Sequence, residues 1–217
     1  MSSIPQNVRT GITLQREINN ASMFVYEAIE RINKTQVFIE ESADVFNFLY
    51  NLSVGFERVQ KIVLHLLDIK ESNDFCIKFN EKYHIHNHAE LHNYIKGKED
   101  PKLNETQIRL LNLLSDFYLN NRYGRYDQIG EYKFEAKELI HFVERSTGKK
   151  IEKLDRDCYK NDIWVKKFLT TQIVNLLRLY YNSVRNLSKS FNIYVDEAPS
   201  ESRINELVHD SEEYCVR

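Results

Sequence analysis

The chain has 217 residues, of which 42% are hydrophobic, and this length and composition suit a single domain with one apolar core. Only six glycines and three prolines are present, which excludes a turn-rich all-β fold and a disordered chain. The 30 basic and 32 acidic residues nearly cancel to a net charge of −2, so a global attraction for nucleic acid is excluded and only a local basic patch remains for such binding.

Apolar residues at helical spacing predict helices over residues 13–34, 43–69, 74–83, 88–96, 104–121, 130–146 and 161–191. The second of these has the clearest apolar stripe, formed by Leu49, Leu52, Phe56, Val59, Val63 and Leu66. Ser42, Asn87 and Asn104 are placed to cap helix starts, and Glu90 would complete a capping box with Asn87.

Gly148 is placed to end the helix at 130–146, and the charged stretch at 149–160 is expected to be a connection. We therefore predict an all-α fold, a bundle of six or seven helices that forms one domain over residues 1–195. The polar residues at 196–217 are expected to form a loosely ordered tail that contains a short helix at 201–209.

The three cysteines, Cys76, Cys158 and Cys215, are far apart and form no CxxC pair, which favours a reducing compartment. No stretch approaches the roughly 18 apolar residues that a membrane helix needs, and the first residues lack the apolar core of a signal peptide. We therefore expect a soluble cytoplasmic protein that does not contact a membrane. No glycine-rich phosphate loop or Ser/His/Asp set is apparent, so no cofactor is expected.

Arg58 and His65 lie seven positions apart in the second predicted helix. At about 100° per residue they fall within roughly 20° of each other on the helical wheel. They share a face, roughly opposite the apolar stripe, with Asn51, Val54 and Ile62. An arginine binds phosphate oxygens, and a histidine acts as a general acid or base near neutral pH, so the pair suits RNA cleavage.

The alternative for this face is a solvated helix surface on which Glu57 and Lys61 form an i,i+4 ion pair. Gly55 flanks the face and would let a neighbouring backbone come close.

The segment LYNLSVGFERVQKIVLHLL, followed by a histidine-rich stretch and RYGRY, resembles the HEPN superfamily over roughly residues 40–190. The resemblance implies a small all-α protein of a prokaryotic antiviral defence or toxin–antitoxin system. Many HEPN members are metal-independent endoribonucleases. Their active site uses an arginine and a histidine that are separated by four to six residues, and the site assembles across a dimer interface. Arg58 and His65 match that spacing, and the resemblance thus implies a catalytic pair and a homodimer. The sequence departs from the family in having Val59 after the arginine and in placing the pair in the middle of an early helix.

The stretch YLNNRYGRYD, residues 118–127, places two arginines and two tyrosines around Gly124. Glycine suits a helix stop, but it does not account for its neighbours. In a turn, Arg122 and Arg125 would converge on phosphate while Tyr123 and Tyr126 stack on unpaired bases. The alternative is that the tyrosines cover the edge of the core and the arginines pair with nearby acids.

Four of the seven histidines, His84, His86, His88 and His92, lie in HIHNHAELH. His88 and His92 are four positions apart, so they share a helix face and are candidate zinc ligands. No obvious third and fourth ligand completes a site, with Cys76 as a mere candidate, so we predict no metal site. An RNA-facing or pH-sensitive surface and an ordinary helix start are the alternatives.

These patterns give two functional hypotheses. In the first, the protein is an RNA-binding, metal-independent endoribonuclease in which Arg58 binds the scissile phosphate and His65 is the acid or base. In the second, it is a non-catalytic helical subunit that binds a protein partner encoded in the same operon.

Overall fold

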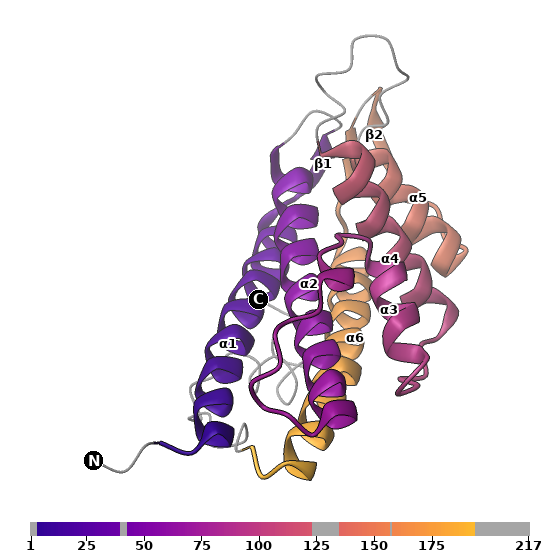
Figure 1. Cartoon of the computed structure of the whole chain (residues 1–217). Coiled ribbons are helices and arrows are strands. Elements are labelled where there is room, and N and C mark those ends of the chain that lie inside the picture. The colour runs from indigo at the N-terminus through magenta and orange to yellow at the C-terminus, as the bar shows by residue number, and fades with distance from the viewer. Residues whose placement is uncertain (1–3, 40–42, 123–134, 157, 194–217) are drawn as a thin grey trace.

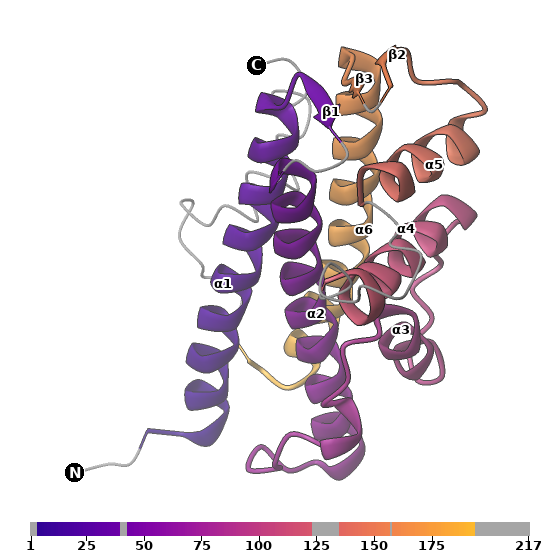
Figure 2. The same cartoon turned by 90° about the horizontal axis from the view of Figure 1, so that it is seen from above.

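The computed structural model describes residues 4–39, 43–122, 135–156 and 158–193. Within these ranges the chain is all-α, with six α-helices and a very small sheet. Three long helices, α1 (Gln6–Lys34), α2 (Ala43–Ser72) and α6 (Ile163–Ser190), run alongside one another (Figure 1). The shorter α3 (His88–Lys96), α4 (Glu105–Asp116) and α5 (Glu135–Thr147) lie together on one side of them (Figures 1 and 2). The prediction of a bundle of about six helices is confirmed.

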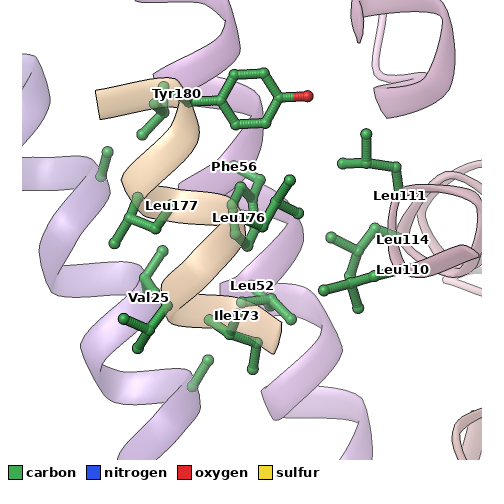
Figure 3. Close-up of a cluster of buried hydrophobic side chains, with 14 of the residues drawn as sticks. Val25, Leu52, Phe56, Leu110, Leu111, Leu114, Ile173, Leu176, Leu177 and Tyr180 are labelled. Carbon is green, nitrogen blue, oxygen red and sulfur yellow. The ribbon is translucent and has the colours of Figure 1, made fainter. Parts of the chain in front are cut away.

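The hydrophobic core lies where α2 and α6 meet α1 on one side and α4 on the other (Figure 3). Leu52 and Phe56 of α2 are fully buried there against residues of α6 such as Ile173. Leucines of α4 close the cluster from the other side. The predicted stripe of α2 therefore faces the core, and α2 is the most enclosed helix of the described chain.

The α1–α2 contact depends on Gly55. A Cβ atom at this position would lie 2.6 Å from Cγ2 of Val25 and 3.1 Å from the carbonyl oxygen of Ala21. Both atoms belong to α1, so the absence of a side chain at Gly55 lets the two backbones approach closely. The expectation of a close backbone neighbour at Gly55 is confirmed.

Two of the predicted helix caps are present. The Asn104 side chain accepts a hydrogen bond from the Gln107 backbone N–H, and the Gln107 side chain accepts one from Asn104 N–H, which makes a full capping box. Asn87 accepts from Glu90 N–H at 3.0 Å, but the Glu90 carboxylate accepts from Tyr94, so only half of that box forms. Ser42 lies outside the described residues.

Some of the predicted helix boundaries are confirmed closely, and others shift. The helix expected at 13–34 begins at Gln6, and the one expected at 161–191 is Ile163–Ser190. The helix expected at 104–121 ends as α4 at Asp116 and continues as a π-helical turn, η2 (Phe117–Asn121). Helix α5 ends at Thr147, followed by Gly148 with a φ of +70°, as expected, whereas residues 130–134 are outside the described ranges.

The helix expected at 74–83 is wrong. Asn73 takes a φ of +52° and ends α2, and the Asp74 carboxylate then accepts a hydrogen bond from Cys76 N–H. This local turn competes with helix formation. Only a 3-10 turn, η1 (Glu81–Tyr83), follows. Phe75, Ile77 and Phe79 alternate along the segment and pack against the core from an extended connection.

The connection expected at 149–160 contains two short strands, β2 (Lys153–Asp155) and β3 (Cys158–Lys160). Strand β3 also pairs antiparallel with β1 (Val37–Ile39), whose Phe38 is fully buried. The sheet order is β1-β3-β2. Each strand has only three residues, which is too few to produce a recognisable alternation of polar and apolar residues in the sequence.

No helix in the described ranges is long and apolar enough to cross a membrane. The division into a domain at 1–195 and a tail at 196–217 stays a prediction, because residues 194–217 lie outside the described part of the chain.

The change Gly55→Ala is expected to destabilise the protein by about 1–3 kcal/mol, because the added methyl would overlap Val25 and the backbone of α1. The helix propensity gained by alanine, up to about 1 kcal/mol, does not offset this overlap. Urea unfolding measures the change. Gly97→Ala is the matched control, since its Cβ would meet nothing nearer than 3.6 Å, and it should be neutral or slightly stabilising. Equal stability of the two variants would contradict the close approach.

Candidate functional site

A groove of about 550 Å³ lies along α2 between α1 and the connection that leads to α3. Helix α2 contributes Arg58 and His65, and α1 contributes Glu17. The remaining lining residues are Thr13, Leu14, Tyr50, Val54, Glu57, Lys61, Ile62, Phe79 and Tyr118. The structure therefore brings the two predicted catalytic residues into one concave site with aromatic and apolar walls.

Arg58 spans the gap between α2 and α1. Its Nη1 donates to Glu17 Oε2 at 2.5 Å, and its guanidinium lies 5.7 Å from the centre of the Phe24 ring. The side chains of Arg58 and Glu17 are 38% and 42% exposed, so solvent screens this ion pair. The guanidinium is thus held in position at the groove and remains within reach of a ligand.

His65 is half-buried about two helical turns further along the groove wall. Its ring centre lies 6.1 Å from that of Phe79, and its Nδ1 is buried with no hydrogen-bond partner. Burial lowers the pKa of His65 below its usual value, and the charge of Asp68 opposes that shift. The imidazole is therefore neutral near pH 7, which is the form that accepts a proton.

The expectation that Arg58 and His65 lie roughly opposite the core is wrong in one respect. Ile62, on the same face, is only 5% exposed. The reason is that α2 has neighbours on this side too, namely α1 and the chain around Phe79. The face is consequently the floor and wall of a groove and not an open helix surface.

Glu57 organises the polar side of the groove. Its carboxylate accepts from Lys61 Nζ at 2.6 Å and contacts His86 Nδ1 at 2.9 Å. Burial raises the pKa of Glu57, but the hydrogen bonds from Lys61 and His86 outweigh it, so the net pKa lies below the usual value. The expected Glu57–Lys61 pair is thus confirmed, within a groove and not on a solvated face.

Arg122 lies over two tyrosines at one end of the groove. Its guanidinium carbon is 4.7 Å from the Tyr118 ring centre and 5.1 Å from that of Tyr50, which is cation–π geometry. The His86 ring lies 4.8 Å from the Tyr118 ring. These four side chains form what we call the aromatic rim of the groove.

Of the residues predicted to hold RNA, Arg122 alone lies within the described ranges. Tyr123, Arg125 and Tyr126 lie outside them, together with Gly124.

The histidine-rich stretch divides into two buried and two exposed rings. His88 Nδ1 lies 3.0 Å from Gln60 Oε1, and His92 Nδ1 lies 3.0 Å from the Tyr180 hydroxyl. Gln60 Nε2 donates to both the His88 carbonyl and the Tyr180 hydroxyl. His88 and His92 share a helix face as predicted, and this face joins α3 to α2 and α6 inside the core.

The outer pair, His84 and His86, is exposed, and Cys76 is an exposed free thiol. Among the residues that the structure describes, no group of three or more His, Cys, Asp or Glu side chains is arranged to hold a metal ion.

The groove contains residues that the sequence did not single out. Glu17 comes from α1 and reaches Arg58 only because of the α1–α2 packing, so no local pattern signals it. Tyr50 and Phe79 belong to no recognisable sequence motif. Tyr118 stands in the stretch YLNNRYGRYD, whose aromatic and basic composition was the one available signal.

Searches of protein families, of curated proteins and of solved structures find no significant match to this chain. The resemblance to the HEPN superfamily therefore stays a prediction from the sequence.

The stability of the protein is expected to fall as the pH falls from about 6.5 to about 4. Full burial lowers the pKa of His88 to about 4, whereas an unfolded histidine titrates near 6.5. In that interval the unfolded chain binds more protons than the folded one, so the free energy of unfolding decreases toward acid, by roughly 3 kcal/mol in total. Urea unfolding at pH 7 and pH 5 measures about 2 kcal/mol of this loss, because that interval ends above the pKa of the folded state.

In the variant His88→Gln, most of this decrease in the free energy of unfolding between pH 7 and pH 5 should be absent. His141→Gln removes an exposed ring and should keep the wild-type decrease. If both variants lose as much stability as the wild type, the buried His88 is not the source.

Proposed function

We propose that the protein is an RNA-binding endoribonuclease of a bacterial defence or toxin–antitoxin system, that it cleaves without a metal ion, and that the groove along α2 is its active site. The observation that carries the proposal is the convergence of Arg58 and His65 in one groove whose rim holds Tyr118 and Arg122. An aromatic ring offers a stacking surface for an unpaired base, and the two arginines offer donors for phosphate.

In the proposed reaction, neutral Nε2 of His65 takes the proton of a ribose 2′-hydroxyl, whose oxygen attacks the adjacent phosphorus. The bond to the 5′ oxygen breaks, and that oxygen leaves with a proton from water or from the imidazolium. Arg58 stabilises the charge that develops on the phosphate oxygens. The lowered pKa of His65, which follows from burial, supports the role of base.

The Arg58–Glu17 pair is compatible with phosphate binding. Because both side chains are more than a third exposed, opening the pair costs little, and the remaining guanidinium donors can serve a phosphate while one still contacts Glu17. Glu17 thereby keeps Arg58 extended across the groove before RNA arrives.

A homodimer is part of the proposal, since HEPN-like sites assemble across two chains. Helix α1, which forms one wall of the groove, carries Val8, Ile12 and Met23 as exposed apolar side chains, and this supports an interface on α1. A protein partner encoded in the same operon fits either functional hypothesis.

The second candidate is a non-catalytic subunit that binds a helical segment of a protein partner. One observation favours it, namely that the cations of the groove wall are already compensated, Arg58 by Glu17 and Lys61 by Glu57. A groove with balanced charge and apolar side chains such as Val54 and Ile62 suits a protein segment as well as a polyanion.

Purified protein is expected to degrade single-stranded RNA in EDTA, and the double change Arg58→Ala/His65→Ala should slow degradation at least about a hundredfold. The control is Arg31→Ala/His141→Ala, which also removes one ion-paired arginine and one histidine but lies away from the groove. It should degrade RNA at the wild-type rate.

If the Arg58/His65 variant degrades RNA as fast as the wild type, the catalytic assignment is wrong. If the wild type neither cuts nor binds RNA but co-purifies with the product of a neighbouring gene, the interaction hypothesis is favoured.

Arg122→Ala is expected to weaken the binding of single-stranded RNA by roughly fivefold to tenfold and to reduce the slope of log affinity against log salt by about one. The reason is that Arg122 supplies a positive charge at the aromatic rim of the groove. Fluorescence anisotropy over a salt series measures both quantities. Arg109→Ala, which removes an arginine paired with Glu105 on α4, should leave them unchanged. Equal salt slopes for the wild type and Arg122→Ala would place the RNA elsewhere.

A further inference from the structure

His86 is bound to the polar side of the groove through a carboxylate. Its Nδ1 lies 2.9 Å from Oε2 of Glu57, and the side chains of His86 and Glu57 are 49% and 14% exposed. Lys61 Nζ donates to the other oxygen of Glu57 at 2.6 Å. Burial raises the pKa of Glu57, but these two contacts bring it below its usual value, so the carboxylate is ionised at neutral pH. A half-exposed histidine and an ionised, largely buried carboxylate thus form a pair at the groove.

Tyr118 holds the same imidazole from a second side. The ring centres of His86 and Tyr118 lie 4.8 Å apart, and the ring planes are inclined by 35°. Tyr118 belongs to η2 and lines the groove. A hydrogen bond at Nδ1 and a ring contact together fix the orientation of the imidazole, and Nε2 is the nitrogen left for a substrate.

The pair lies at the height of Arg58 along the groove. Glu57 and Arg58 are consecutive on α2, so their side chains leave the helix about 100° apart and at nearly the same height. Arg58 reaches toward Glu17 of α1, whereas Glu57 reaches His86 in the chain that leads to α3. A phosphate bound by Arg58 would therefore lie at the level of His86. His65 lies about two helical turns further along α2, and side chains on a helix lean back toward its N-terminus.

We propose that His86 is a second catalytic residue of the groove, the general acid that gives its Nε2 proton to the leaving 5′ oxygen, and that Glu57 is its positioning residue. A carboxylate that accepts from Nδ1–H holds a catalytic imidazole in one orientation and directs Nε2 at the reacting atom. The inference rests on the proposed endoribonuclease function, and it assigns the source of the proton that the leaving oxygen needs.

With two histidines the atoms and protons of the reaction balance. Neutral His65 takes the proton of the 2′-hydroxyl while the 2′ oxygen forms a bond to phosphorus. The bond from phosphorus to the 5′ oxygen breaks, its electron pair stays on that oxygen, and the oxygen takes the proton from protonated His86. The products are a 2′,3′-cyclic phosphate and a 5′-hydroxyl. His65 ends protonated and His86 neutral, and proton exchange with water restores both.

The charged and titratable groups that face His86 come from two parts of the chain. Helix α2 contributes Glu57 and Lys61, which are bound to each other. The π-helical turn contributes Tyr118, and Arg122 after it lies over the Tyr118 ring. Glu57 is the only carboxylate among these four groups. Nδ1–H can therefore donate to Glu57 in either protonation state of His86, and it is Nε2 that gains or loses the proton.

The test compares two single-stranded RNA substrates in EDTA, with either oxygen or sulfur as the 5′ bridging atom of the scissile bond. A thiolate leaves without a proton, so a general acid accelerates the cleavage of the oxygen substrate alone. His86→Gln is expected to cleave the oxygen substrate at least about a hundredfold more slowly than the wild type, and the sulfur substrate within about twofold of the wild-type rate. Glu57→Gln should show the same pattern with a smaller loss.

Two further variants serve as controls. His65→Ala should be slow on both substrates, because both need the 2′-hydroxyl to be deprotonated. His84→Gln removes an exposed ring from the same histidine-rich stretch, and it should cleave both substrates at the wild-type rate.

The wild type alone gives a second measurement. Its kcat/KM for the oxygen substrate should fall on the alkaline side of the pH–rate profile, where the acid has lost its proton. For the sulfur substrate that alkaline fall should be absent.

The outcomes separate this inference from the proposed function. Equal losses on both substrates in His86→Gln, or no loss on either, would overturn the role of His86 and leave the endoribonuclease proposal standing. The same alkaline fall for both substrates in the wild type would also overturn it, and that comparison does not depend on the folding of a variant. If the wild type cleaves neither substrate, the endoribonuclease proposal fails and the general-acid role fails with it.

Discussion

The rest of the structure depends on the enclosure of α2 by helices on both sides. A helix that is enclosed over most of its surface shields many of its polar side chains from water, and a buried polar side chain is stabilised when it finds a partner inside the protein. Gln60 is fully buried and finds its partners in the His88 main chain and the Tyr180 hydroxyl. Asp68 is 6% exposed and finds Tyr83.

This requirement explains the histidine-rich stretch. His88 satisfies Gln60 in the core, and His86 meets Glu57 at the groove. His92 reaches Tyr180 of α6, so α3 is bound to both α2 and α6 through polar contacts. The histidines thus fix where the chain after α2 lies, and that chain in turn supplies Phe79 as a groove wall. The polar contacts inside the core therefore also determine the shape of the groove.

The sequence was sufficient for the fold class because the helices are long and their apolar stripes are regular. It failed where tertiary pairing decides the conformation. Residues 74–83 look helical in composition, yet Asn73 and Asp74 form a local turn, and the aromatic rings that follow pack one by one against the core. Strand β3 forms because Phe38, more than a hundred residues earlier, anchors its partner.

The candidate site could be predicted in part, because helical geometry alone determines which residues of one helix share a face. The spacing of Arg58 and His65 on one helix fixes that they share a face, whatever surrounds it. The spacing does not fix what covers the face, so Glu17 and the aromatic rim could not be found from local patterns. The groove has nearly balanced charge because each wall cation meets a carboxylate of the same domain. If RNA binds there, affinity must come from phosphate contacts of Arg58 and of Arg122 at the rim and from stacking on Tyr118, since the groove wall itself carries no surplus of positive charge.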